Sequence, residues 1–167
     1  MTRVNFIGMD PGASGCLCRL QIDPDGTHDI MFLDNDANVR AKGEWLTQHS
    51  REGVQMTMIE DVHSLPTMSA KSNFTFGWNV SELHTLLQCL GMPYDMIQPK
   101  KWQSTVGIKV PTQFKGPVRA KRLKQATADK CDQLYPGCNI YGPKGGLKDG
   151  RSDALMIAHY CRMTYNN

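Results

Sequence analysis

Residues 4–12 read Val-Asn-Phe-Ile-Gly-Met-Asp-Pro-Gly, an apolar run that ends in an acid and a turn. Such a run, bounded by Pro-Gly, predicts a buried strand with Asp10 at its carboxyl end. A carboxylate in this place is costly to keep charged unless a cation meets it. Taken alone, Asp10 before Pro11-Gly12 is equally suited to setting a turn.

The sequence around this stretch predicts a mixed α/β sheet of five strands flanked by helices. Strands are expected over residues 3–9, 15–22, 28–33, 54–60 and 94–97, and helices over 39–51, 74–90, 117–134 and 152–163, with a turn or short helix over 99–106. Short turns with Gly and Pro make the first three strands antiparallel. A helical crossover precedes the fourth strand, which favours a parallel pairing of that strand with the first.

The helix predicted over 74–90 has Trp78 and four leucines at helical spacing, which indicates a well-buried helix. Its first residues, Phe74 to Gly77, are more typical of a core segment than of a platform for stacking bases. Trp102, beside Lys100 and Lys101, is compatible with either role.

Four carboxylates recur at the ends of predicted elements. Alternation places Val54, Met56, Met58 and Glu60 on one face of the fourth strand, so Glu60 follows the buried side. Adjacent parallel first and fourth strands bring Asp10 and Glu60 side by side. Asp149 and Asp153 are four residues apart and share one helical face, although Asp149 is equally suited to capping that helix. Oxygen ligands without a His or Cys cluster favour two Mg²⁺ ions, with Mn²⁺ as a substitute.

The charge is divided unevenly along the 167 residues. Residues 1–61 carry ten acids and five bases, a net of −5, and residues 62–167 carry six acids and fourteen bases, a net of +8. No acid lies between Asp95 and Asp129, where basic residues accumulate. That run suits a phosphate backbone or a solvated helix face. The residues predicted to bind DNA are Lys71, Lys100, Lys101, Lys109, Lys115, Arg119, Lys121, Arg122, Lys124 and Arg151.

The length fits one domain over residues 1–167. The chain has no apolar stretch long enough for a membrane span and no signal-peptide pattern, so we expect a cytoplasmic protein, in the host cytoplasm if a phage encodes it.

Five segments together resemble the RuvC-type Holliday junction resolvases of the RNase H-like superfamily. They are residues 8–12, 59–62, 74–77, 93–102 and 148–155. The resemblance implies an RNase H-like fold and a homodimer that binds four-way DNA junctions and nicks two strands symmetrically. It also implies that Asp10, Glu60, Asp149 and Asp153 hold the Mg²⁺ ions.

The sequence departs from the bacterial pattern of this family at two positions. In bacterial members the final acidic pair, or a histidine in its place, is three residues apart. Gly150 stands at that position here, and Asp149 gives the four-residue separation of phage-like relatives. An aromatic follows the glutamate by three residues in bacterial members, whereas this chain has His63, either a polar loop residue or a neighbour of the scissile phosphate.

Two other functions are compatible with the sequence. The departures could mark a junction-binding protein whose catalytic site is disabled. The Gly8–Gly12 motif also occurs in actin-like phosphotransferases, but those enzymes need two domains.

Overall fold

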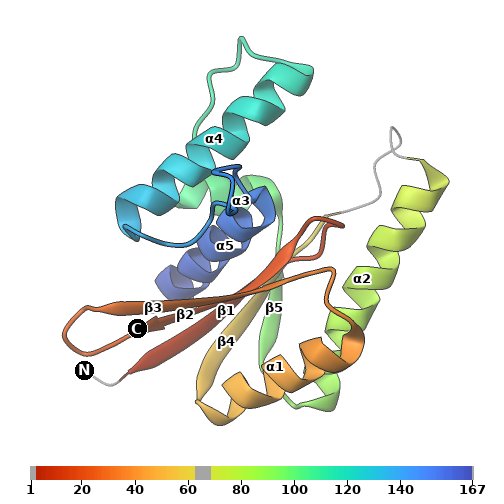
Figure 1. Cartoon of the computed structure of the whole chain (residues 1–167), viewed down its shortest axis with the longest axis vertical. Helices are drawn as coiled ribbons and strands as arrows, with labels where there is room; N and C mark the ends of the chain where they lie inside the picture. Colours follow the sequence, from red (N-terminus) through yellow and green to blue (C-terminus); the bar gives the residue numbers. More distant parts are fainter. Residues whose placement is uncertain (1–2, 63–68, 167) are drawn as a thin grey trace.

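The computed structural model describes residues 3–62 and 69–166. The strands are β1 (Val4–Asp10), β2 (Cys16–Ile22), β3 (His28–Asp34), β4 (Val54–Glu60) and β5 (Tyr94–Ile97), and the helices are α1 (Val39–Arg51), α2 (Ala70–Cys89), α3 (Pro99–Thr105), α4 (Gly116–Leu134) and α5 (Asp149–Tyr165). Figure 1 shows their arrangement. His63 and its predicted role lie outside the described residues.

The strands form one mixed sheet in the order β3-β2-β1-β4-β5. Strand β2 is antiparallel to β1 and to β3, whereas β4 is parallel to β1 and to β5. The prediction of a mixed sheet with three antiparallel strands first is therefore confirmed. Met9 pairs with Ile59, so the next residues, Asp10 and Glu60, end two neighbouring strands at the same edge of the sheet.

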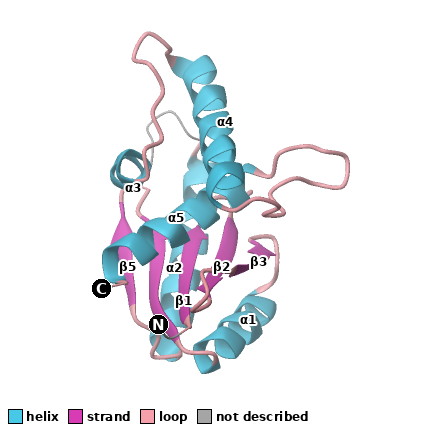
Figure 2. Ribbon diagram, turned by 90° about the vertical axis from the view of Figure 1, so that its left-hand side faces the viewer, coloured by secondary structure: helices cyan, strands magenta, loops and turns pink. Residues whose placement is uncertain are grey.

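Helices cover the two faces of the sheet (Figures 1 and 2). Helix α5 packs on β1, β2 and β4, and α3 and α4 pack on α5. Helices α1 and α2 contribute Leu46, Leu83 and Leu87 to a second hydrophobic cluster on the opposite face. Because buried apolar surface contributes roughly 25 cal/mol per Å² to folding, these two layers fix which face each strand residue takes.

Val54 of β4 lies on the opposite face of the sheet from the one predicted. The pairing with β1 shifts register between Asn5 and Phe6. Met56 and Met58 therefore pack with the α5 side, whereas Val54 packs with the α1 and α2 side. The alternation predicted for Glu60 holds from Met56 onward, because the irregularity lies before it.

Gly8 lets α5 approach the sheet closely. A Cβ atom at Gly8 would lie 2.2 Å from the carbonyl oxygen of Ala154 and 2.3 Å from the amide nitrogen of Ala158. Only a residue without a side chain fits between β1 and α5 in this packing. The contact sets the height of α5, and of its acidic start, above the end of β1.

Helix α2 starts earlier and is less buried than the sequence predicts. Ser69 caps it by accepting a hydrogen bond from the amide of Ser72. Phe74 is 71% exposed and Trp78 is 63% exposed, so the prediction of a buried Phe74–Gly77 segment is wrong for Phe74. The cause is position: the first turns of α2 extend past the edge of the sheet (Figure 1), and only the later turns lie over it.

Within residues 3–62 and 69–166, no helix combines the length and apolar character that a membrane span requires.

Candidate functional site

Three carboxylates converge from distant parts of the chain. Gly8 faces α5, and Asp10 follows it by two residues on the same face of β1. Met58 faces α5, and Glu60 follows it by two residues on β4. Asp153 lies near the start of α5, which packs on both strands. The sequence prediction that these acids meet is thus supported by the topology.

Burial raises the pKa of each of the three acids, and the negative charge of a neighbouring carboxylate adds to the effect in each case. Burial raises the pKa of Glu60 to about 7, and the charge on Asp10 adds to this effect. The pKa of Asp153 lies well above its usual value because of burial and then the charges of Asp10 and Glu60. Burial also raises the pKa of Asp10, against a hydrogen bond from the amide of Gly12. Raised pKa values mean that too little positive charge lies nearby to stabilise these carboxylates in their ionised form.

Asp149 lies beside these three acids and does not cap α5. Lys148 occupies the cap position, and no side chain makes a capping hydrogen bond there. Asp149 is the first helical residue, and its charge raises the pKa values of Asp10 and Asp153. The alternative that Asp149 serves as the helix cap is therefore wrong in this structure.

The packing also explains why the acid stands at 149. A Cβ atom at Gly150 would lie 2.1 Å from the carbonyl oxygen of Ser14 and 2.8 Å from the Cα of Gly15. The β1–β2 turn leaves no space for a side chain at Gly150, so an acid three residues before Asp153 is incompatible with this turn. The four-residue separation of Asp149 and Asp153 is therefore the one that this close contact with the β1–β2 turn allows.

Lys124 of α4 supplies a positive charge at the edge of the site. Its ammonium group forms an ion pair with the carboxylate of Asp149. The hydrogen bond with Asp149, together with the charges of Asp149, Asp153 and Asp10, raises the pKa of Lys124. The sequence placed Lys124 among the DNA-binding residues and did not predict this contact. Its spacing from Ala128 and Cys131, which are buried on one stripe of α4, is a signal that it faces inward.

Two asparagines that the sequence did not single out fix the turn after Asp10. Asn35 donates hydrogen bonds to the carbonyl oxygens of Pro11 and Gly12, at 3.2 and 2.8 Å. Asn79 of α2 donates to the same Pro11 oxygen at 3.2 Å. Nothing local in the sequence identifies either residue, because each acts on a turn that is distant along the chain.

Trp102 is fully buried, which settles the two roles left open for it. Its indole nitrogen donates a 2.8 Å hydrogen bond to Oε1 of Glu60. The ring is therefore part of the core next to the acids and is closed to a nucleotide.

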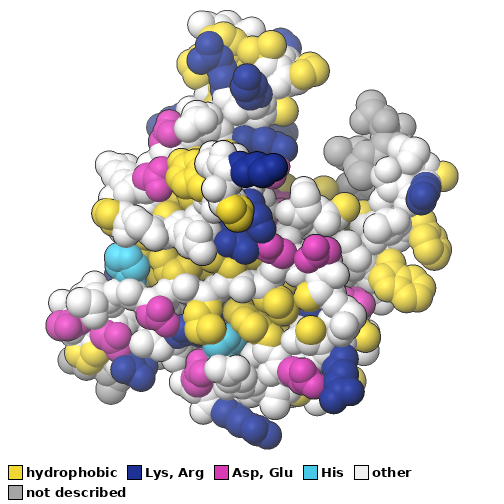
Figure 3. Space-filling view, in the orientation of Figure 1, with side chains coloured by type: hydrophobic (Ala, Val, Ile, Leu, Met, Phe, Trp, Pro, Cys, Tyr) yellow, Lys and Arg dark blue, Asp and Glu magenta, His cyan; other side chains and the backbone are white. Residues whose placement is uncertain are grey.

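The basic residues predicted to bind DNA are mostly exposed. Lys71, Lys100, Lys101, Lys109, Lys115, Lys121, Arg122 and Lys124 are exposed, and Arg119 and Arg151 are partly buried. Arg119 donates to the carbonyl oxygen of Val110. Arg151 donates two hydrogen bonds to Asp34, which holds the pKa of that acid down to about 2 with help from Lys148. Lys and Arg side chains gather on the projecting α4 region in Figure 3.

The acids are not arranged as a metal cage. Among the described residues, no group of three or more His, Cys, Asp or Glu side chains is placed so that it could hold a metal ion. Asp10, Glu60 and Asp149 instead meet donors of the protein: the amide of Gly12, the indole of Trp102 and the ammonium of Lys124. As a donor set, carboxylate oxygens with raised pKa values suit a hard divalent cation such as Mg²⁺.

A mixed sheet in this order, with acids from two parallel strands and the last helix at one edge, defines an RNase H-like α/β fold. Two solved structures share it across almost their whole length. One is Thermus thermophilus RuvC in complex with a Holliday junction substrate, with a TM-score of 0.56 and 13% identity over 96% of each chain. The other is Thermus thermophilus RuvC, with a TM-score of 0.53 and 13% identity over 97% of this chain and 98% of that one.

The sequence matches no protein-family model and no curated protein. The likeness to the two structures establishes the fold, which confirms the RuvC-like fold that the sequence motifs imply.

Proposed function

We propose that this protein is a structure-selective DNA endonuclease that resolves four-way junctions by paired, symmetric nicks. The observation that carries the proposal is the meeting of Asp10, Glu60 and Asp153 at one edge of a RuvC-like fold, where burial and repulsion raise all three pKa values. Acids held in this way gain most from a divalent cation, and an exposed basic region lies beside them.

Asp10, Glu60 and Asp153 are the proposed metal ligands, with Asp149 as the fourth. Two Mg²⁺ ions, or Mn²⁺ in their place, supply activation of a water molecule and stabilisation of the leaving 3′ oxygen at sites of this kind. Lys124 would give up its ion pair with Asp149 to the cations, because both compete for the same carboxylate. The ammonium group would then be available to a phosphate of the DNA at this edge of the site.

The DNA-binding surface in this proposal is the exposed basic side of α3 and α4, together with Lys71 of α2. Lys100, Lys101, Lys121 and Arg122 are exposed there. Arg122 stacks on Phe114 at 3.9 Å from the ring centroid, which holds the guanidinium outward near the α4 start. Arg151 reaches DNA only by leaving Asp34, so its first role is to tie β3 to α5.

A homodimer is the proposed assembly, because a symmetric junction needs two equivalent sites. The exposed aromatics of α2 support it: the ring centroids of Phe74 and Trp78 lie 6.3 Å apart on the surface. A groove of about 350 Å³ beside Trp78 is bordered by Val39 and Leu86. Exposed apolar groups of this kind mark interfaces in proteins that act as oligomers.

The test is cleavage of a synthetic four-way junction in Mg²⁺ by purified protein. The wild type should give nicks at symmetric positions in two opposed strands, and Asp10→Asn should reduce the rate by at least about 100-fold, because one ligand is lost. Asp25→Asn is the matched control, since this exposed acid lies in the turn between β2 and β3 and accepts hydrogen bonds from the amide and hydroxyl of Thr27. It should cleave like the wild type.

Two results would contradict the proposal. Full cleavage by the Asp10 variant would show that the acids take no part in the reaction. Tight junction binding with no nicks in Mg²⁺ or Mn²⁺ would favour a binding protein with a disabled site.

A further inference from the structure

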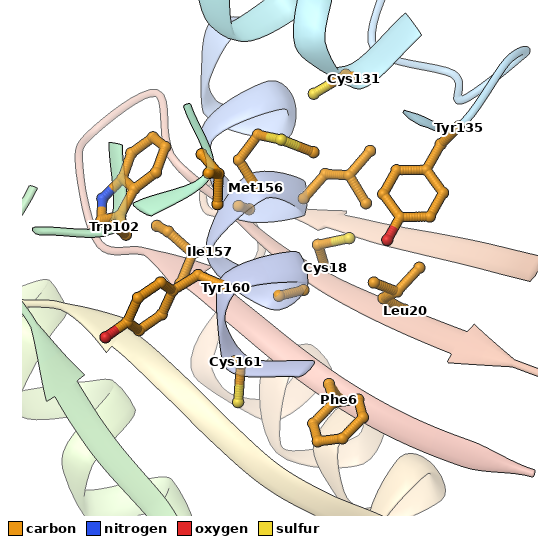
Figure 4. Packing of buried hydrophobic residues seen from close by; sticks show 14 of the residues in the cluster. Phe6, Cys18, Leu20, Trp102, Cys131, Tyr135, Met156, Ile157, Tyr160 and Cys161 are labelled. Carbon is orange, nitrogen blue, oxygen red and sulfur yellow. The ribbon is translucent and has the colours of Figure 1, made fainter. Parts of the chain in front are cut away.

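Trp102 makes a contact that packing alone does not require. The side chain is fully buried in the hydrophobic cluster that also holds Ile157 of α5 (Figure 4). A buried indole needs one acceptor for its N–H group, and most acceptors in proteins are backbone carbonyl oxygens. Here the acceptor is the carboxylate of Glu60, at 2.8 Å and away from solvent.

The local structure holds this contact in place. Glu60 pairs with Ile97 across β4 and β5, and α3 begins two residues after Ile97. The first turn of α3 therefore lies beside the end of β4. The carbonyl oxygen of Gln98 accepts from the amides of Lys101 and Trp102, which fixes the start of the helix. Trp102 points inward from this turn, whereas Lys100 and Lys101 are exposed.

The hydrogen bond restrains Glu60 in a way that suits a ligand. The single indole N–H engages Oε1, and no other described donor is bonded to Oε2. Among the described residues, Oε2 therefore has no donor with which a cation would compete, while the hydrogen bond to Oε1 restrains the carboxylate. A ligand whose orientation is already fixed loses less conformational freedom on binding than a free one.

From this geometry we infer that Trp102 is a positioning residue for the acid site: its indole N–H orients Glu60 toward the divalent cation. The inference rests on the proposed function for its metal site, but it concerns binding of the cation and not cleavage.

The test measures Mn²⁺ binding without DNA, by electron paramagnetic resonance. Trp102→Phe removes the N–H group and keeps an aromatic ring, and it should weaken Mn²⁺ binding about tenfold, the lower end for loss of a group that orients a ligand. Val106→Ala is the matched control, because Val106 is 5% exposed in the same cluster, follows α3 directly and is not bonded to Glu60. It should lose stability and bind Mn²⁺ like the wild type.

In the cleavage assay, Trp102→Phe should need about tenfold more Mn²⁺ for half-maximal rate and approach the wild-type rate at saturation. A loss of packing would instead lower the rate at every Mn²⁺ concentration. Unchanged Mn²⁺ binding by Trp102→Phe, or equal weakening by Val106→Ala, would overturn the inference.

A second measurement uses the wild type and does not depend on folding of the variant. The indole N–H resonance of Trp102, assigned by elimination with Trp45→Phe and Trp78→Phe, should shift when Mg²⁺ is added, while the other two indole resonances stay. A stationary Trp102 resonance in protein that binds Mg²⁺ would overturn the inference, and protein that binds no divalent cation would overturn it together with the metal site. Protein that binds Mn²⁺ normally but leaves junctions intact would refute the proposed function alone.

Discussion

The groups around Glu60 have opposite effects on the pKa of its carboxyl group. Burial and the Asp10 charge raise its pKa to about 7, and the hydrogen bond from Trp102 lowers it. The carboxyl group therefore titrates near neutral pH when no cation is present. This single residue links protonation, stability and metal binding at the site.

The raised pKa of Glu60 makes stability depend on pH. Below the unfolded pKa of about 4.5, Glu60 is protonated in both states and does not penalise folding. As pH rises from about 4.5 to about 7, the unfolded chain releases the Glu60 proton while the folded protein keeps it, so stability is lost, and the loss is complete once the folded protein also ionises. Glu60→Gln should therefore gain stability relative to the wild type between pH 4.5 and 7, on the order of 2 kcal/mol.

Urea unfolding of both proteins in a chelator, at a series of pH values, checks this prediction. The comparison between them cancels the contribution of other groups such as His159, whose pKa burial lowers to about 4. Saturating Mg²⁺ should remove the advantage of the Gln variant. A difference that stays constant with pH would mean that Glu60 has an ordinary pKa.

Among the elements, β1 and α5 form the contact on which the site depends. Because a Cβ atom at Gly8 would meet the Ala154 carbonyl oxygen at 2.2 Å, Gly8→Ala must push α5 away from the sheet. The expected cost is about 3 kcal/mol of unfolding free energy, as for other overpacked cores, and Asp153 moves with the helix. Chemical denaturation measures the cost, and Mn²⁺ binding reports the displacement.

Gly43→Ala is the control for this change. Gly43 lies inside α1, and a Cβ atom there meets only the Leu86 side chain at 3.4 Å. Because Ala favours a helix over Gly, this variant should be as stable as the wild type or more stable by up to about 1 kcal/mol. Equal effects of the two substitutions would show that the Gly8 contact is not tight.

The elements show how far the sequence can predict the fold and the site. The antiparallel pairing of the first three strands, the parallel pairing of β1 and β4, and the meeting of Asp10 with Glu60 followed from turns, crossovers and alternation. The exposure of Phe74 did not, because helical spacing identifies a face but not where the sheet beneath it ends.

Contacts between segments that are distant along the chain likewise could not be predicted from the sequence. The spacing of Asp149 and Asp153 favoured a shared face, but the contact of Gly150 with the Ser14 carbonyl oxygen, which excludes a side chain there, has no local signal in the sequence. The indole of Trp102 and the ammonium of Lys124 reach the acids from α3 and α4 across long stretches of chain. No local pattern encodes such a meeting.

For the whole molecule, the exposed aromatics of α2 predict self-association. Replacing Phe74 and Trp78 together by Ser should convert a dimer to a monomer, because most of the energy of such interfaces comes from a few large side chains. Sedimentation velocity at several concentrations measures this. Met163→Ser is the control, since Met163 is 52% exposed near the end of α5. A wild type that stays monomeric at about 100 μM, far above a typical micromolar Kd, would contradict the assembly.

Helix α5 is also the last element along the chain, and this order has a consequence during synthesis. The five strands, with Asp10 and Glu60, leave the ribosome before residues 149–165 exist. Since domains fold as the nascent chain emerges, one apolar face of the sheet remains exposed until α5 packs on it. Asp153 arrives only then. A partly made chain therefore exposes apolar surface and lacks Asp153, and the group of Asp10, Glu60 and Asp153 is complete only when α5 covers this face.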